Sequence, residues 1–159
     1  MKLKGITDED FVNYKKPSMF ISACSCTFKC EKESGVCCCQ NSGLAKSKTI
    51  EADDDALIRR YLANPITKAI VFGGLEPFDQ PGELKIFLEK LRSAYHCTDD
   101  VVIYTGYTKE ECAPFIGEFS RFGPLVVKYG RFIPGMEPHT DRELGVKLAS
   151  DNQFAERIG

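Results

Sequence analysis

Residues 19–39 read MFISACSCTFKCEKESGVCCC, a short apolar run that leads directly into six of the chain's eight cysteines. The run Met19–Ala23 has the composition of a short buried strand. The loop after it carries Cys26 and Cys30 in a C-x3-C pair and then the triplet Cys37–Cys39. Because ligands of parallel α/β sheets bind at the carboxyl ends of strands, thiols in this position indicate a binding site.

Outward from this stretch, short apolar runs alternate with amphipathic segments. We predict further strands at residues 68–72, 101–104, 125–129 and 146–150, and helices at 53–64, 81–95 and from 108 toward 119. Strands alternating with helices imply parallel pairing through right-handed crossovers. A closed eight-stranded barrel typically needs about 250 residues. We therefore predict an α/β fold, a single-domain partial (open) barrel of about five to six mostly parallel strands, over residues 1–159.

Helix boundaries follow from capping residues. Asp53 is an expected N-cap, and Pro65 ends the helix that begins there. Thr108 and Glu111 have the spacing of a capping box. Pro114 lies inside the helix that this box starts, so we expect a break or kink there.

Composition and charge exclude several classes of protein. The net charge is −2 with lysines and arginines scattered, which argues against a nucleic-acid partner. No apolar run approaches the roughly 20 residues that span a bilayer. Residues Met1–Asp10 carry charges of both signs and no apolar core, so we expect no secretory signal and no membrane partner. The expected location is the cytoplasm.

The clustered cysteines are the unusual feature of the composition. Thiols in a reducing compartment bind a metal or cluster more often than they form disulfides. Spacing alone does not choose between structural zinc, which takes four N or S ligands, and an iron–sulfur cluster, which usually takes four thiolates. Cys97 and Cys112 stand apart from this group, and we expect both to be small buried side chains.

Two further loops follow predicted strands. The sequence Gly73-Gly74-Leu75-Glu76-Pro77 comes after the strand at 68–72, and Thr105-Gly106 comes after the strand at 101–104. Paired glycines let a backbone approach a ligand closely, and a carboxylate beyond them is suited to accept hydrogen bonds from an ammonium group. The alternative is a simple turn with a solvated Glu76. All three loops are expected at one edge of the sheet.

These motifs resemble those of the radical S-adenosylmethionine enzymes. The matching segments, in order, are Phe20–Ala23 with Cys26-x3-Cys30, the Gly-Gly-Leu-Glu-Pro loop, Ile103–Tyr107, Tyr129–Phe132 and Ala149–Gln153. Together they look most like the small activating proteins of anaerobic (class III) ribonucleotide reductases, and the resemblance covers roughly residues 18–155.

The sequence departs from the family pattern at two positions. The third cysteine of C-x3-C-x2-C would fall at residue 33, which is Glu33, so the third ligand must come from Cys37, Cys38 or Cys39. In the activators this cysteine is often followed by one residue and then Asn. Cys39-Gln40-Asn41 has that form, and the resemblance therefore implies Cys39. The second departure is the inserted Leu75, beyond which Glu76 is expected to supply the carboxylate.

The resemblance implies that Cys26, Cys30 and Cys39 hold a [4Fe–4S] cluster that cleaves S-adenosylmethionine, with no other catalytic residue. Side chains and backbone expected to bind S-adenosylmethionine are those of Gly73, Gly74, Glu76, Thr105, Gly106 and Asn41, with Arg131 a weaker candidate. The implied partners are a glycyl-radical enzyme, such as the large subunit of anaerobic ribonucleotide reductase, and an electron donor such as flavodoxin or ferredoxin. The alternatives are radical chemistry on a peptide or small metabolite, or a non-catalytic module that holds zinc or a cluster.

Overall fold

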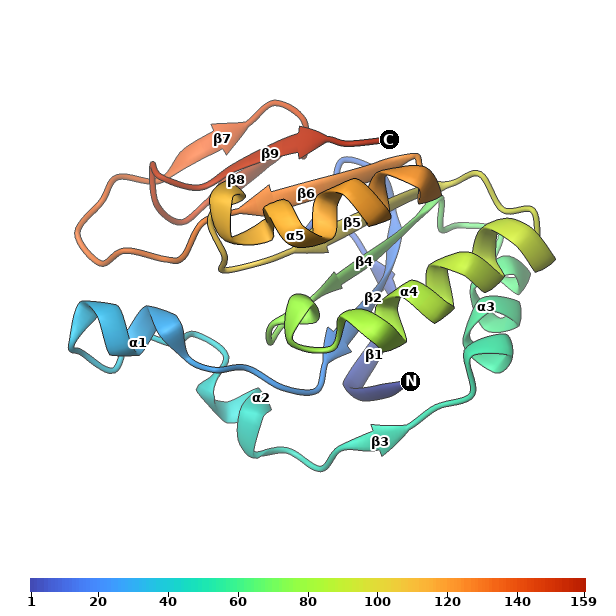
Figure 1. Ribbon diagram of the computed structural model, residues 1–159, viewed down its shortest axis with the longest axis horizontal. Coiled ribbons are helices and arrows are strands. Elements are labelled where there is room, and N and C mark those ends of the chain that lie inside the picture. Colours follow the sequence, from blue (N-terminus) through green and yellow to red (C-terminus); the bar gives the residue numbers. More distant parts are fainter.

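The main sheet contains seven strands in the order β3-β1-β2-β4-β5-β6-β9 (Figure 1). The computed structural model describes residues 1–159. The strands of this sheet are β1 (Lys2–Asp10), β2 (Ser18–Ala23), β3 (Ile50–Glu51), β4 (Ala69–Gly73), β5 (Asp100–Tyr104), β6 (Leu125–Tyr129) and β9 (Phe154–Arg157). The central strands β2, β4, β5 and β6 pair in parallel, so their carboxyl ends lie at one edge. The outer strands β1, β3 and β9 pair antiparallel to their neighbours.

The three long helices cover one face of this sheet (Figure 1). The helices are α1 (Lys29–Ser34), α2 (Ser42–Lys46), α3 (Asp54–Ala63), α4 (Pro81–Glu89) and α5 (Lys109–Phe119). Apolar side chains of α3, α4 and α5 pack with strand residues such as Ile21, Phe72 and Ile103 in the larger apolar core. Burial of this face is the main stabilisation of the fold.

The opposite face of the sheet divides into a packed half and an open half. Toward the amino ends of the strands, Val71, Val102 and Val126 pack against Tyr14 and Leu144. A separate two-stranded hairpin, β7 (His139–Asp141) with β8 (Val146–Leu148), contributes to this cover. Toward the carboxyl ends the same face is left for a cavity, which is described below.

The predicted α/β class is confirmed, and each predicted strand coincides with an observed one. The sheet is larger than expected because the edge strands β1, β3 and β9 were not predicted. The strand predicted at 146–150 is β8, which belongs to the separate hairpin and not to the main sheet. Only the central pairings are parallel, and the curvature of a partial barrel stays a prediction.

The predicted helix boundaries hold at the amino ends. The Asp53 carboxylate accepts the Ala56 backbone N–H at 2.8 Å, and the Thr108–Glu111 capping box is formed. The predicted break at Pro114 is wrong, because α5 continues from Lys109 to Phe119. Pro114 lies on the exposed side of the helix, where water can hydrogen-bond the carbonyl that it leaves unpaired.

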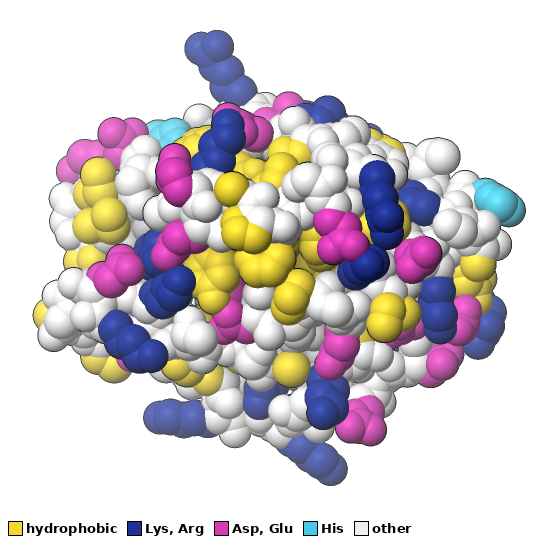
Figure 2. Space-filling model, in the orientation of Figure 1, with side chains coloured by type: hydrophobic (Ala, Val, Ile, Leu, Met, Phe, Trp, Pro, Cys, Tyr) yellow, Lys and Arg dark blue, Asp and Glu magenta, His cyan; other side chains and the backbone are white.

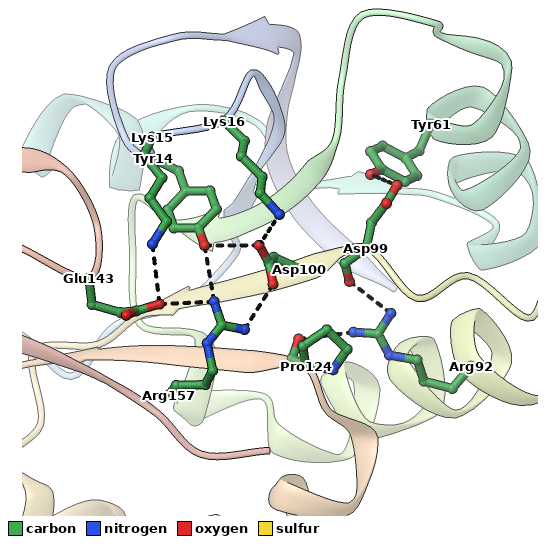
Figure 3. Close-up of polar contacts among 10 residues, drawn as sticks. All are labelled: Tyr14, Lys15, Lys16, Tyr61, Arg92, Asp99, Asp100, Pro124, Glu143 and Arg157. Carbon is green, nitrogen blue, oxygen red and sulfur yellow. Dashed lines mark hydrogen bonds and ion pairs between the residues drawn. The ribbon is translucent and has the colours of Figure 1, made fainter.

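A buried carboxylate joins the strands at the other end of the sheet (Figure 3). Asp100, at the start of β5, accepts hydrogen bonds from Tyr14 at 3.0 Å, Lys16 at 2.5 Å and Arg157 at 2.9 Å. Its side chain is only 7% exposed. Burial acts to raise the pKa of Asp100, but the three hydrogen bonds outweigh burial and hold that pKa at about 2. Asp100 therefore links β5 to the β1–β2 loop and to β9.

The face drawn in Figure 2 carries lysine, arginine, aspartate and glutamate side chains interspersed with one another. No continuous basic patch is visible on it, as the scattered charges of the sequence predicted. None of the helices combines the length and the apolar composition that crossing a bilayer requires.

We predict that Asp100→Asn destabilises the protein by about 2 kcal/mol at pH 7, because Lys16 loses its counter-charge, Arg157 keeps only its pair with Glu143, and the pKa shift has this size. The lowered pKa means that this stabilisation is complete above the unfolded value near 4. It is lost as the pH falls toward about 2. Urea unfolding at pH 7 and at acidic pH measures both effects.

The matched control is Asp8→Asn, which removes an ion pair between Asp8 and Arg60 whose side chains are about half exposed. An exposed pair contributes less than about 1 kcal/mol. Equal losses in the two variants would show that the buried network has no special role.

Candidate functional site

A cavity of about 660 Å³ lies at the carboxyl ends of the parallel strands. Its volume is within the usual range for a small-molecule site, roughly 300–1,000 Å³. Eight of the nine residues that the sequence analysis selected line it: Cys26, Cys30, Cys39, Asn41, Gly74, Glu76, Thr105 and Gly106. The ninth, Gly73, packs behind the wall. Arg131 also lines the cavity.

The three thiols reach the cavity from one continuous stretch of chain, residues 26–39. Cys26 follows β2, Cys30 lies in α1, and Cys39 precedes α2. Burial raises the pKa of the Cys26 thiol and raises that of Cys30 to about 11. No three cysteine, histidine or acidic side chains lie close enough in this structure to enclose a metal ion.

Of the cysteine triplet, Cys39 alone faces the cavity. The exposed Cys37 donates its thiol to Glu31 Oε1 at 3.3 Å, and Cys38 Sγ lies 3.3 Å from the Ser34 hydroxyl. Glu31 also accepts the backbone N–H of Cys39 at 3.1 Å. Hydrogen bonds with the α1 residues Glu31 and Ser34 thus hold the other two thiols outside the cavity.

The Glu76 carboxylate joins the loops that follow β4 and β5. One oxygen accepts the Thr105 hydroxyl at 2.7 Å and the Phe78 backbone N–H at 3.0 Å. The other oxygen accepts the Gly106 backbone N–H at 2.8 Å. Glu76 is 4% exposed, so the alternative of a solvated side chain is wrong. Burial raises its pKa, and the three hydrogen bonds act in the opposite direction.

The same segment positions the cysteine loop. The Glu76 backbone N–H donates to the Ser25 carbonyl at 2.8 Å. The Thr27 N–H donates to Asp79 at 2.9 Å, and the Cys24 N–H donates to Gln80 at 2.8 Å. Cys26 is therefore held between two residues that are both bonded to the loop after β4.

The two glycines of this loop have different roles. A Cβ on Gly73 would lie 3.0 Å from the Phe20 ring, so Gly73 allows close packing within the sheet. Gly74 has a φ of +77°, which side chains rarely adopt, and a Cβ there would lie 2.7 Å from Leu44 Cδ2. Gly74 thereby lets α2 pack onto the loop beside the cavity.

An ion-pair network closes one side of the cavity mouth. The Arg131 guanidinium lies 2.6 Å from Glu111 in α5 and 3.1 Å from Glu33 in α1. Lys29 in α1 also pairs with Glu111, at 3.0 Å, and its ammonium lies 4.2 Å from the Tyr107 ring centroid. These contacts attach the cysteine-bearing segment to α5 and to the loop after β6.

Lys128 is one of the cavity residues that the sequence analysis missed. It is 6% exposed, and it occupies the fourth position of the otherwise apolar or aromatic strand LVVKY. The sequence did contain a sign of this residue, namely a lysine within a buried strand. Because lysine is rarely buried unless it is paired, such a position suggests a functional role.

The family comparison adds to this geometry. The model of the 4Fe-4S single cluster domain matches residues 16–132, which include β2, β4, β5, β6 and all three cavity thiols. The chain belongs to this family. It is therefore an iron–sulfur cluster-binding domain. No curated protein and no solved structure matches the chain.

The thiol groups that line the cavity are suitable ligands for a [4Fe–4S] cluster. Thiolates are the usual ligands of such clusters, and three thiols line the same cavity here. The segment that carries them is polar and partly exposed. The thiols must lose their protons on binding, which makes cluster binding favour higher pH.

We predict that Gly74→Ala destabilises the protein by about 1–2 kcal/mol, because alanine is strained at a positive φ and the added Cβ would meet Leu44. Urea unfolding measures the loss. The control is Gly43→Ala in α2, where a Cβ meets nothing within 4 Å and alanine favours the helix. A Gly74→Ala protein as stable as the wild type would contradict this account of the loop.

Proposed function

We propose that this protein binds a [4Fe–4S] cluster on Cys26, Cys30 and Cys39 and uses it to cleave S-adenosylmethionine reductively. One observation carries the proposal: the three thiols and the buried Glu76 carboxylate line the same cavity. Three protein ligands leave one iron without a thiolate, whereas such clusters usually have four. That iron would be open to the amino and carboxylate groups of S-adenosylmethionine.

A reduced cluster held by these three thiols would supply the one electron that cleavage of the sulfonium C–S bond requires, with methionine and the 5′-deoxyadenosyl radical as the products. The protein orients the reactants and excludes water. Glu76 accepts a hydrogen bond from the amino group through Oε2, which has one donor, the Gly106 N–H, whereas Oε1 already has two. Thr105 and Gly106 hold that carboxylate in place. Gly74 and Asn41 complete the binding wall on the side of α2.

We further propose that the radical abstracts a hydrogen atom from a backbone glycine of a glycyl-radical enzyme, such as the large subunit of anaerobic ribonucleotide reductase. The products are 5′-deoxyadenosine and a glycyl radical. A small domain with its cavity at the carboxyl ends of the parallel strands suits a macromolecular substrate. Exposed Ile133 and Met136, in the loop after β6, support docking at this mouth. Flavodoxin or ferredoxin in the cytoplasm would supply the electron.

If Cys26, Cys30 and Cys39 are the ligands, the variants Cys26→Ala, Cys30→Ala and Cys39→Ala should each lose most or all of the bound cluster. The reason is that the two remaining thiolates do not retain it. Iron and sulfide content after anaerobic reconstitution measures this. The matched control is Cys37→Ala, which removes a neighbouring thiol that faces solvent. Cys97→Ala, in the core, is the second control. A full cluster in Cys39→Ala would move the third ligand to Cys37 or Cys38.

The activity is tested by supplying dithionite and S-adenosylmethionine to the reconstituted protein under anaerobic conditions. We expect 5′-deoxyadenosine and methionine in equal amounts, quantified by chromatography. Protein with a full cluster that never forms 5′-deoxyadenosine would contradict the proposal. Purification with zinc, and without iron or sulfide, would instead favour a structural zinc module. Cleavage without a glycyl radical on any partner would point to a peptide or a small metabolite as the target.

A further inference from the structure

Tyr107, in the loop after β5, contacts each of the other loops that surround the cavity. Its hydroxyl donates a hydrogen bond to Asp79 Oδ1, in the loop after β4. The Lys29 ammonium, at the start of α1, lies 4.2 Å from the centroid of its ring. Its carbonyl accepts the Gly130 N–H at 2.9 Å, and its own N–H donates to the Thr105 hydroxyl at 3.0 Å. Tyr107 does not itself line the cavity, so it acts on the site through these neighbours.

Two of these contacts reach the loop between the cysteines of the C-x3-C pair. Asp79 accepts the Tyr107 hydroxyl at Oδ1 and the Thr27 N–H at Oδ2, the latter at 2.9 Å. Because donors engage both oxygens, they fix the orientation of the carboxylate. Thr27 directly follows the first cysteine of the pair, and Lys29 directly precedes the second. Tyr107 therefore restrains two of the three residues between these cysteines.

The third of these residues, Phe28, has a left-handed backbone. Its φ is 54° and its ψ is 40°, a conformation that is uncommon for a bulky residue other than glycine. Such strain persists only where the surrounding structure holds it, and it concentrates at functional sites. The neighbours that Tyr107 restrains, Thr27 and Lys29, lie on either side of this strained residue. The turn directs the Phe28 N–H at Cys26 Sγ, at 3.3 Å.

A donor directed at Cys26 Sγ affects the electronic properties of any cluster that this sulfur ligates. Reduction adds negative charge to a cluster, so a hydrogen bond to a ligand sulfur stabilises the reduced state more than the oxidised state. Hydrogen bonds to the sulfurs are among the factors that set the reduction potential. This donor belongs to the backbone of Phe28, so its direction depends on the turn and not on the Phe28 side chain.

We propose that Tyr107 is a positioning residue, which holds the cysteine loop so that the Phe28 N–H donates to the Cys26 sulfur and raises the reduction potential of the cluster. Its hydroxyl acts through Asp79, and its ring acts through the Lys29 ammonium. The inference rests on the part of the proposed function that makes the C-x3-C cysteines cluster ligands. It does not depend on the identity of the molecule that binds beside the cluster.

The test compares the reduction potential of the reconstituted cluster in the wild type and in Tyr107→Phe, which removes the hydroxyl and keeps the ring over which Lys29 lies. Anaerobic redox titration followed by electron paramagnetic resonance measures this potential. We expect a more negative potential in Tyr107→Phe, because the Phe28 N–H is less well directed and Asp79 loses a donor. The ratio of oxidised to reduced cluster at a fixed potential should rise by up to about tenfold, which is about 59 mV for a one-electron couple.

The same substitution in an Asp79→Ala background isolates the route of the effect. Asp79→Ala shifts the potential through its own loss of charge, so the quantity compared is the effect of Tyr107→Phe within each background. Because the hydroxyl acts through Asp79, we expect this effect to vanish in the Asp79→Ala background. The matched control is Tyr95→Phe, which removes a hydroxyl that donates to Asp55 at 3.0 Å outside the cavity and should leave the potential unchanged. The thermal transition and the iron content of each variant establish that it is folded and loaded.

Each outcome bears on the inference. A wild-type potential in Tyr107→Phe would overturn it and leave the proposed function standing, and an equal shift in the Asp79→Ala background would overturn the route through Asp79. Folded Tyr107→Phe and Asp79→Ala proteins that both fail to retain a cluster would support the positioning role. A full cluster in both Cys26→Ala and Cys30→Ala would overturn the ligand assignment and the inference together.

Discussion

The hydrogen bonds of Glu76 are the interaction on which the site depends. Its carboxylate binds the Thr105 hydroxyl and the Gly106 N–H, and its backbone N–H binds the Ser25 carbonyl. Three loops that follow three parallel strands are thereby held at one edge of the sheet. Because a buried carboxylate that loses its donors is costly, these loops cannot separate without a large loss of stability. The position of Cys26 beside the glycine loop follows from this constraint.

The same cavity contains groups that the fold alone does not explain. Glu76 and Lys128 are each buried without an ion-pair partner, whereas the buried Asp100 at the other end of the sheet is paired with Lys16 and Arg157. Buried charges of this kind reduce stability, and proteins retain them mostly at functional sites. The contrast between the two ends of the sheet therefore separates a structural network from a binding site.

Local patterns in the sequence predicted much of the fold. The apolar runs of β2, β4, β5 and β6 and the caps at Asp53 and Thr108 depend on neighbouring residues, so they could be read directly. The strand β1 could not, because Lys2–Asp10 is mostly polar and becomes a strand through pairing with β2. Pro114 was misjudged because its tolerance depends on which side of α5 faces water.

The candidate site was predictable to a similar degree. The ends of parallel strands meet, so the convergence of the cysteine, glycine and Thr105 loops followed from the order of elements. The burial of Glu76 and the cavity position of Lys128 did not, because they depend on sheet register and on contacts between distant segments. Which cysteine of the triplet faces the cavity likewise depends on hydrogen bonds to Glu31 and Ser34.

The central claim is that the cavity brings S-adenosylmethionine into direct contact with a cluster held by three cysteines. Electron–nuclear double resonance of the reduced, anaerobically reconstituted protein, with S-adenosylmethionine labelled with ¹⁵N at its amino group, tests this most directly. The account predicts a hyperfine coupling between that nitrogen and the cluster. A fully loaded cluster that shows no coupling to bound, labelled S-adenosylmethionine would contradict it.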